Sequence, residues 1–216
     1  MTIDIMGGVL PLVSAIGPVL GGRVLFAVPT RSPRFVLTFD DGPDPATTPA
    51  LLDVLRRRGA RATFFLIGER ASAHPELVAR IAAEGHEIGN HTWRDEPTWR
   101  LGPDEFRDSL RATRRALEPH GPVRWFRPGS GWPTPDHLAI AEAEGLRCVL
   151  GSAVAISGAG AGTASTARRL NRVVRRGSVV VLHEGPQRAG VVATVDELLE
   201  RTARRGLSAV TLSAAV

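Results

Sequence analysis

The hydrophobic pattern of the chain alternates between two periods from Arg34 onward. Short, nearly continuous apolar runs are followed by longer segments in which apolar residues recur every three or four positions. The first kind is typical of strands buried on both faces, and the second is typical of amphipathic helices. The pattern predicts strands at residues 35–39, 62–67, 87–90, 124–126, 147–150, 179–182 and 208–212. It predicts helices at residues 48–58, 75–84, 104–118, 135–144 and 195–205.

Four of the predicted helices end at a glycine, namely Gly59, Gly85, Gly145 and Gly206. Glycine directly after a helix is the usual left-handed cap, so these positions mark the helix ends. Residues 157–166 are rich in Gly, Ala and Ser and are predicted to form a loop. Seven strands that alternate with helices favour a parallel α/β sheet with right-handed crossovers. The pattern alone leaves a closed or nearly closed barrel and an open doubly wound sheet as alternatives.

Length and composition indicate an ordinary globular protein. The 216 residues are 43% hydrophobic and 23% charged, which suits one domain with a substantial core. All 27 basic residues are arginines, and the net charge is only +5. The arginines are scattered through helical segments and do not alternate with aromatic residues, so we do not expect a nucleic-acid partner.

The first 33 residues differ from the rest of the chain. Residues 5–22 carry no charge, which suggests a leader or a packed apolar helix. The segment lacks a basic start, and its glycines and prolines make a poor signal peptide and a poor membrane helix. We therefore expect an N-terminal segment over residues 1–33 and a domain over residues 34–216. The sequence leaves localisation, membrane association and oligomeric state open.

Candidate catalytic residues follow the predicted strands. Asp40 and Asp41 follow the first strand, His91 follows the third, Arg127 the fourth and His183 the sixth. The carboxyl ends of barrel strands are where active sites are built, so these side chains should lie together. Adjacent carboxylates repel each other, and a site that keeps both usually holds a cation or gives them different roles.

A metal site is one interpretation of these residues. If His91 and Asp95 were one helical turn apart, they would share a face and could bind one cation together with Asp41. Three protein ligands with an open position for water are typical of a hydrolytic metal site. The alternative for Asp95 is a structural role, as a cap or in an ion pair with Arg94 or Arg100.

The motifs carry a resemblance to a known family. Residues 38–43 read T-F-D-D-G-P, His91-Thr92 is followed by Asp95, Arg127 precedes Ser130 and Gly131, and Leu182-His183 ends a strand. This ordered set resembles the polysaccharide deacetylases with a NodB-homology domain, also called carbohydrate esterase family four. The resemblance covers residues 35–212.

The resemblance implies a distorted (β/α) barrel with about seven parallel strands and a metal-dependent hydrolase that removes acetyl groups from N-acetylated sugars. By position, it makes Asp41 and His91 metal ligands, with Asp95 where the family has a second histidine. It makes Asp40 the general base, Arg127 the residue that orients Asp40, and His183 the general acid. The backbone N–H near Ser130 would stabilise the oxyanion, together with a divalent metal, most commonly Zn²⁺.

Two departures from the family pattern change these expectations. Asp95 adds a negative charge to the metal site, and its hard oxygen ligands shift the metal preference away from Zn²⁺ toward Mn²⁺, Mg²⁺ or Ca²⁺, with Co²⁺ also possible. Residues 148–162 lack the acidic residue that usually pairs with the acid histidine, so we expect the pKa of His183 to be raised less than usual.

The substrate is expected to be a carbohydrate. Trp132 is a candidate platform for a sugar ring, and partly buried packing is the alternative for this side chain. The leading hypothesis is deacetylation of a chitin-like, peptidoglycan or oligosaccharide amide. Two alternatives are a catalytically impaired relative that binds glycan or metal, and an amidohydrolase of a small non-sugar amide. The sequence leaves the glycan and the native metal open.

Overall fold

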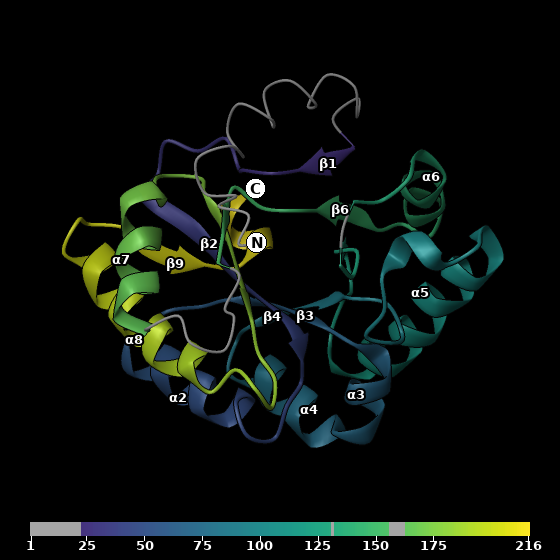
Figure 1. The fold of residues 1–216 in the computed structure, drawn as a ribbon, viewed down its shortest axis with the longest axis horizontal. Helices are drawn as coiled ribbons and strands as arrows, with labels where there is room; N and C mark the ends of the chain where they lie inside the picture. Colours follow the sequence, from purple (N-terminus) through teal and green to yellow (C-terminus); the bar gives the residue numbers. More distant parts are fainter. Residues whose placement is uncertain (1–22, 131, 156–162) are drawn as a thin grey trace.

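The computed structural model describes residues 23–130, 132–155 and 163–216, which form a curved sheet of parallel strands surrounded by helices (Figure 1). The strand order is β1-β6-β5-β4-β3-β2-β8-β7. The strand β9 also pairs with β2 and is not part of this linear order. The strands are β1 (Val24–Leu25), β2 (Arg34–Gly42), β3 (Thr63–Leu66), β4 (Glu87–Asn90), β5 (Trp125–Phe126), β6 (Arg147–Val149), β7 (Ala153–Val154), β8 (Val179–His183) and β9 (Ser208–Val210).

Eight α-helices are present in the described part of the chain. Figure 1 shows α2 to α8 around the outside of the sheet, with α7 and α8 side by side. The helices are α2 (Thr48–Arg57), α3 (Gly68–Ala73), α4 (Pro75–Ala83), α5 (Pro103–Leu117), α6 (Pro135–Ala143), α7 (Thr163–Val173), α8 (Gly190–Ala203) and α9 (Leu212–Ala215). Short 3-10 turns occur at Thr98–Arg100 and Glu118–His120.

The predicted distorted parallel barrel is confirmed, with all seven predicted strands and all five predicted helices present. The prediction missed two strands, β1 and β7, because each is only two residues long and carries no periodicity. Residues 23–33 were assigned to the N-terminal segment, but β1 pairs with β6, so the sheet begins before Arg34. Of the residues that the structure describes, none belongs to a helix long and apolar enough to cross a membrane.

Three helices were also missed, namely α3, α7 and α9. The six residues of α3 and the four of α9 are too few to show a helical period. The predicted loop at 157–166 is wrong at its end, because α7 begins at Thr163, while residues 156–162 lie outside the described residues. Ala167 and Leu170 of α7 are buried three positions apart, which anchors this helix on the core.

The strand β2 places the candidate site residues on the inner face of the barrel. Phe35, Leu37 and Phe39 pack in the cluster beneath the outer helices, whereas Val36 packs in a separate inner cluster. Since side chains alternate along a strand, Asp40 shares the inner face with Val36. Both faces are buried, which is why this strand appears as a continuous apolar run up to its polar end.

Candidate active site

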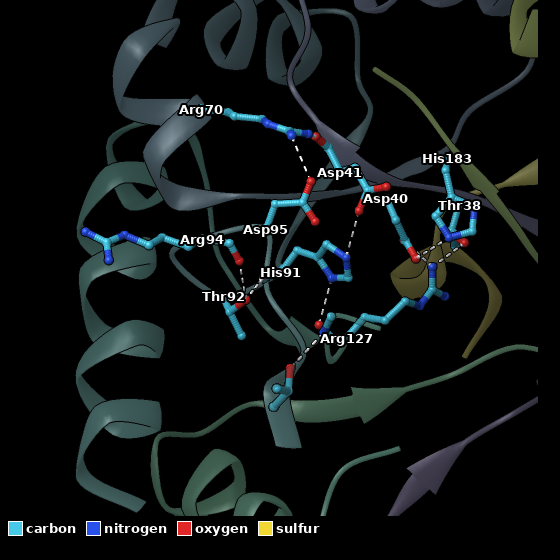
Figure 2. A network of polar contacts seen from close by, with 12 residues as sticks. Thr38, Asp40, Asp41, Arg70, His91, Thr92, Arg94, Asp95, Arg127 and His183 are labelled. Atoms are coloured by element: carbon cyan, nitrogen blue, oxygen red, sulfur yellow. Dashed lines mark hydrogen bonds and ion pairs between the residues drawn. The ribbon is translucent and has the colours of Figure 1, made fainter. Parts of the chain in front are cut away.

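The carboxyl ends of four strands bring the predicted catalytic residues together (Figure 2). Asp40 in β2 is in register with His183 in β8, its neighbour in the sheet. His91 directly follows β4, and Arg127 directly follows β5. The prediction that these side chains meet at one edge of the sheet is therefore confirmed by the geometry.

A buried ion pair joins Asp40 to Arg127. Arg127 Nη1 lies 2.6 Å from Asp40 Oδ1, and both side chains are only 4% exposed. The same nitrogen also donates to the hydroxyl of Thr38, at 2.7 Å. Two further donors of Arg127 bind main-chain carbonyls, Nε that of Val149 and Nη2 that of Leu150. The guanidinium is thus fixed in one orientation and holds one oxygen of Asp40 in place.

Removal of Arg127 is expected to leave a buried carboxylate without a partner. Arg127→Met should therefore lower the free energy of unfolding by about 3 kcal/mol, because breaking a buried pair costs more than the pair itself contributes. Urea unfolding of the metal-free protein would measure the loss. The double variant Asp40→Asn/Arg127→Met should recover part of it. If the double variant were no more stable than Arg127→Met, the unpaired carboxylate of Asp40 would not be the cause of the loss.

A second buried pair joins Asp41 to His91. His91 Nε2 lies 3.3 Å from Asp41 Oδ1, and His91 Nδ1 lies 2.8 Å from the main-chain oxygen of Arg127. Burial alone would raise the pKa of Asp41, but the hydrogen bond with His91 and the nearby positive charges bring it down to about 2. Burial would lower the pKa of His91, but the carboxylates of Asp40 and Asp41 together raise it. Both pKa shifts favour the ion pair in which Asp41 is charged and His91 carries the proton.

His183 faces the free oxygen of Asp40. Its Nε2 lies 4.0 Å from Asp40 Oδ2, and its Nδ1 is buried and has no hydrogen-bond partner within the described residues. Burial lowers the pKa of His183, and the carboxylates of Asp40 and Asp41 only partly oppose this effect. Within the described residues, no acidic side chain therefore pairs with Nδ1 of His183, and the lowered pKa makes its neutral form dominant at pH 7.

Asp95 lies in a different environment from the one we expected. Residues 91–97 form bends and no helix, so the predicted helical turn between His91 and Asp95 is wrong. Asp95 Oδ2 is paired with Arg70 Nη2 at 2.9 Å, and the Asp95 side chain is 56% exposed. Across residues 23–130, 132–155 and 163–216, no group of three His, Cys, Asp or Glu side chains is arranged to hold a metal.

Strained backbone is concentrated at this edge of the sheet. Among the described residues other than glycine, only Asp41, Thr92 and Ser130 have a positive φ, at 71°, 67° and 43°. Each lies in a segment that carries a candidate site residue. Such conformations cost free energy and persist where the surrounding structure enforces them, often at functional sites.

The two candidate substrate-binding residues lie after β5. Ser130 is exposed, and its left-handed backbone turns the chain beyond Arg127. Trp132 is 45% exposed, and its ring centroid lies 5.7 Å from that of Phe26. One part of this ring therefore packs on the protein, and the remainder is accessible to solvent.

Three charged residues at the site were missed by the sequence analysis. Arg70 from α3 contacts Asp95, Arg188 Nη2 lies 3.5 Å from Asp41 Oδ2, and Glu184 is buried behind Gly42. Arg70 and Arg188 each follow a strand end within six residues, which is the one signal that could have identified them. The scattered arginines of the chain obscured that signal.

Glu184 points to the helix-covered face of β8, opposite His183, as strand alternation predicts. Its carboxyl is fully buried and accepts a hydrogen bond from Thr48 Oγ1 at 2.5 Å, while its Oε1 has no partner among the residues described. Burial raises the pKa of Glu184 to about 8. A Cβ at Gly42 would lie 1.8 Å from Glu184 Oε1, so the end of β2 can approach this carboxyl only as glycine.

Known proteins are similar to this chain in both sequence and fold. A family model for polysaccharide deacetylases matches residues 27–149. A peptidoglycan-N-acetylglucosamine deacetylase of Bacillus cereus is 32% identical over 201 residues, which cover 89% of this chain and 92% of that protein. The crystal structure of the Bc1960 peptidoglycan N-acetylglucosamine deacetylase has a TM-score of 0.85 and 31% identity, over 89% of this chain and 92% of that one.

A metal-containing relative has the same architecture. A family 4 acetyl xylan esterase from Clostridium thermocellum, solved in complex with a cobalt ion, has a TM-score of 0.79. It is 28% identical, over 84% of this chain and 89% of that one. The chain therefore belongs to the polysaccharide deacetylase family, whose deacetylases are metal-dependent hydrolases that remove acetyl groups from N-acetylated carbohydrate.

Proposed function

We propose that the chain removes the acetyl group from N-acetylglucosamine units of a glycan, with peptidoglycan as the first candidate substrate. The observation that carries this proposal is the convergence of two buried acid–cation pairs, Asp40–Arg127 and Asp41–His91, at one edge of the barrel. The similar deacetylases support the choice of peptidoglycan. An amide resists hydrolysis, so the site must supply a strong nucleophile, stabilise charge on oxygen and deliver a proton to nitrogen.

The pair Asp41–His91 fits a divalent metal ion. With Nδ1 of His91 donating to the carbonyl of Arg127, the neutral ring directs the lone pair of Nε2 toward the Asp41 carboxylate. Two lone pairs that face each other need a cation between them, and without a metal a proton fills this role. We propose that Asp41 and His91 hold the ion and that Asp95 is the third protein ligand. A metal ion bound here acidifies water and polarises the acyl oxygen.

Two arguments bear on the identity of the ion. Family resemblance favours Zn²⁺, with Co²⁺ also possible, whereas a second carboxylate ligand would favour harder ions such as Mn²⁺ or Mg²⁺. We propose Zn²⁺ as the native ion, with the other three as candidates in the assay below.

Asp40 and His183 have complementary roles in this proposal. Arg127 occupies Oδ1 of Asp40, and Oδ2 is left to accept a proton from the attacking water. His183, on the other side of Asp40, is placed to deliver a proton to the leaving amine. Because burial lowers the pKa of His183, its charged form is scarce at neutral pH. The proposal therefore implies a slower proton delivery than in relatives that pair this histidine with a carboxylate.

Sugar binding would involve the segment after β5. The exposed part of Trp132 offers a flat apolar surface to a sugar ring, and the N–H groups near Ser130 are candidates for oxyanion stabilisation.

Acetate release is the experiment that tests this function. The purified chain would be supplied with Zn²⁺, Co²⁺, Mn²⁺ or Mg²⁺ and incubated with N-acetylated peptidoglycan, chito-oligomers and a small aryl acetamide. We expect acetate from the glycans, and none after chelation. Release from the aryl acetamide alone would assign the chain to small amides. No release with any ion would contradict the proposal.

A second candidate function is supported by two specific observations. Asp95 is engaged by Arg70, and Nδ1 of His183 has no partner within the described part of the chain. Both features weaken catalysis, so a relative that binds glycan with little turnover is the alternative. Glycan binding in a titration without acetate release would support it.

A further inference from the structure

Arg70 connects two of the candidate metal-binding segments. It lies in α3, directly after β3, and its guanidinium reaches across the edge of the sheet (Figure 2). Nη2 pairs with Asp95 Oδ2 at 2.9 Å, and Nη1 donates a hydrogen bond to the main-chain oxygen of Asp41. One side chain therefore holds both the loop that carries Asp95 and the strained backbone of Asp41.

The ion pair with Arg70 changes the state of Asp95. A guanidinium and a divalent ion are both cations and compete for the same carboxylate. With Arg70 on Asp95, the described residues contain no three-ligand cluster, and Asp41 and His91 remain as a closely spaced pair. The residue in the position of the family's second histidine is thus bound to an arginine of its own chain.

The pair is weak enough to open. Arg70 and Asp95 are 32% and 56% exposed, and ion pairs with this exposure change an equilibrium constant by about two- to fivefold. The hydrogen bond to Asp41 gives Arg70 a second anchor, so its guanidinium can stay beside the site after Asp95 leaves it.

We propose that Arg70 is a positioning residue that withholds Asp95 from the metal site, so that a divalent ion must displace Arg70 to gain its third protein ligand. The inference rests on the metal site of the proposed function. It makes metal affinity a property of the Arg70–Asp95 pair as well as of the ligands. Metal binding then couples to the position of the 91–97 loop.

A double-mutant cycle on the full chain tests the proposal. Metal-free wild type, Arg70→Met, Asp95→Ala and the double variant would be titrated calorimetrically with Zn²⁺ and with Mn²⁺. We expect Arg70→Met to raise metal affinity about two- to fivefold, because Asp95 no longer has to leave an ion pair. Asp95→Ala should lower the affinity, and Arg70→Met should give no increase in the Asp95→Ala background.

Three further variants make the result specific. Arg70→Lys keeps the charge and should restore an affinity close to that of the wild type. Arg80→Met is the matched control, since Arg80 on α4 is 34% exposed and pairs with Glu84, directly after α4, and with Asp53 on α2. This variant should leave metal affinity unchanged. Asp41→Ala should abolish binding, and retained binding there would refute the metal site itself.

Two other results of the double-mutant cycle would contradict the proposal. If Arg70→Met changes the affinity by the same factor with Asp95 and with Ala at position 95, Arg70 acts only through the main chain of Asp41. If Arg70→Met lowers the affinity in the wild-type background alone, Arg70 supports Asp95 as a ligand. Either result overturns the proposal. Circular dichroism of every variant would verify folding.

Discussion

Asp40→Asn is expected to lower kcat for acetate release by about 10²- to 10⁴-fold, the usual contribution of a general base. The amide cannot take a proton from water, yet it keeps an oxygen that can accept the hydrogen bond from Arg127. Metal affinity should stay close to the wild-type value, because Asp41 and His91 form the proposed ligand pair. Acetate release and calorimetric metal titration on the same samples would measure both effects.

The neighbouring carboxylate provides the control. Asp41→Asn should lose metal binding as well as turnover, since Asp41 is the acid paired with His91. If Asp40→Asn also loses metal, the division of the two adjacent aspartates into base and ligand is wrong.

Glu184→Gln is expected to stabilise the metal-free protein at pH 8 relative to the wild type. Burial raises the pKa of Glu184 from 4.5 to about 8, so the folded chain holds a proton that the unfolded chain releases above pH 4.5. The stability of the wild type therefore falls as the pH rises from about 4.5 to 8, and glutamine removes this dependence. Between pH 5 and pH 8, the free energy of unfolding of the variant should rise by on the order of 3 kcal/mol relative to that of the wild type.

Urea unfolding of both proteins across this pH range would measure the gain. Glu197→Gln on α8 is the matched control, since Glu197 pairs with Arg201 on the outer surface. Its free energy of unfolding should stay within about 0.5 kcal/mol of the wild-type value across this pH range. If the difference in free energy of unfolding between Glu184→Gln and the wild type did not change with pH, Glu184 would not retain a proton in the folded protein.

The strands and the placement of the catalytic residues could be predicted because burial on both faces produces continuous apolar runs. The β2 and β8 runs end at Asp40 and His183, and parallel pairing then brings these residues into register. The parallel topology alone therefore predicts at which edge of the sheet the site lies, even when no side-chain contact is known.

The contacts that tune the site could not be predicted. Sequence spacing suggested a helical turn from His91 to Asp95, but Thr92 adopts a left-handed conformation and the segment bends. Arg70 and Arg188 reach Asp95 and Asp41 from other parts of the chain. Such long-range pairs depend on tertiary packing, and a chain with 27 arginines offers many equivalent partners.

Anomalous diffraction from crystals soaked in Co²⁺ tests the central claim most directly. The account predicts one strong peak bounded by the carboxylate of Asp41 and Nε2 of His91, at coordination distances of about 2.0–2.2 Å. In that state, the carboxylate of Asp95 should coordinate the ion and no longer pair with Arg70. A peak elsewhere, or no peak in a protein that releases acetate, would contradict the assignment of this edge of the barrel as the catalytic metal site.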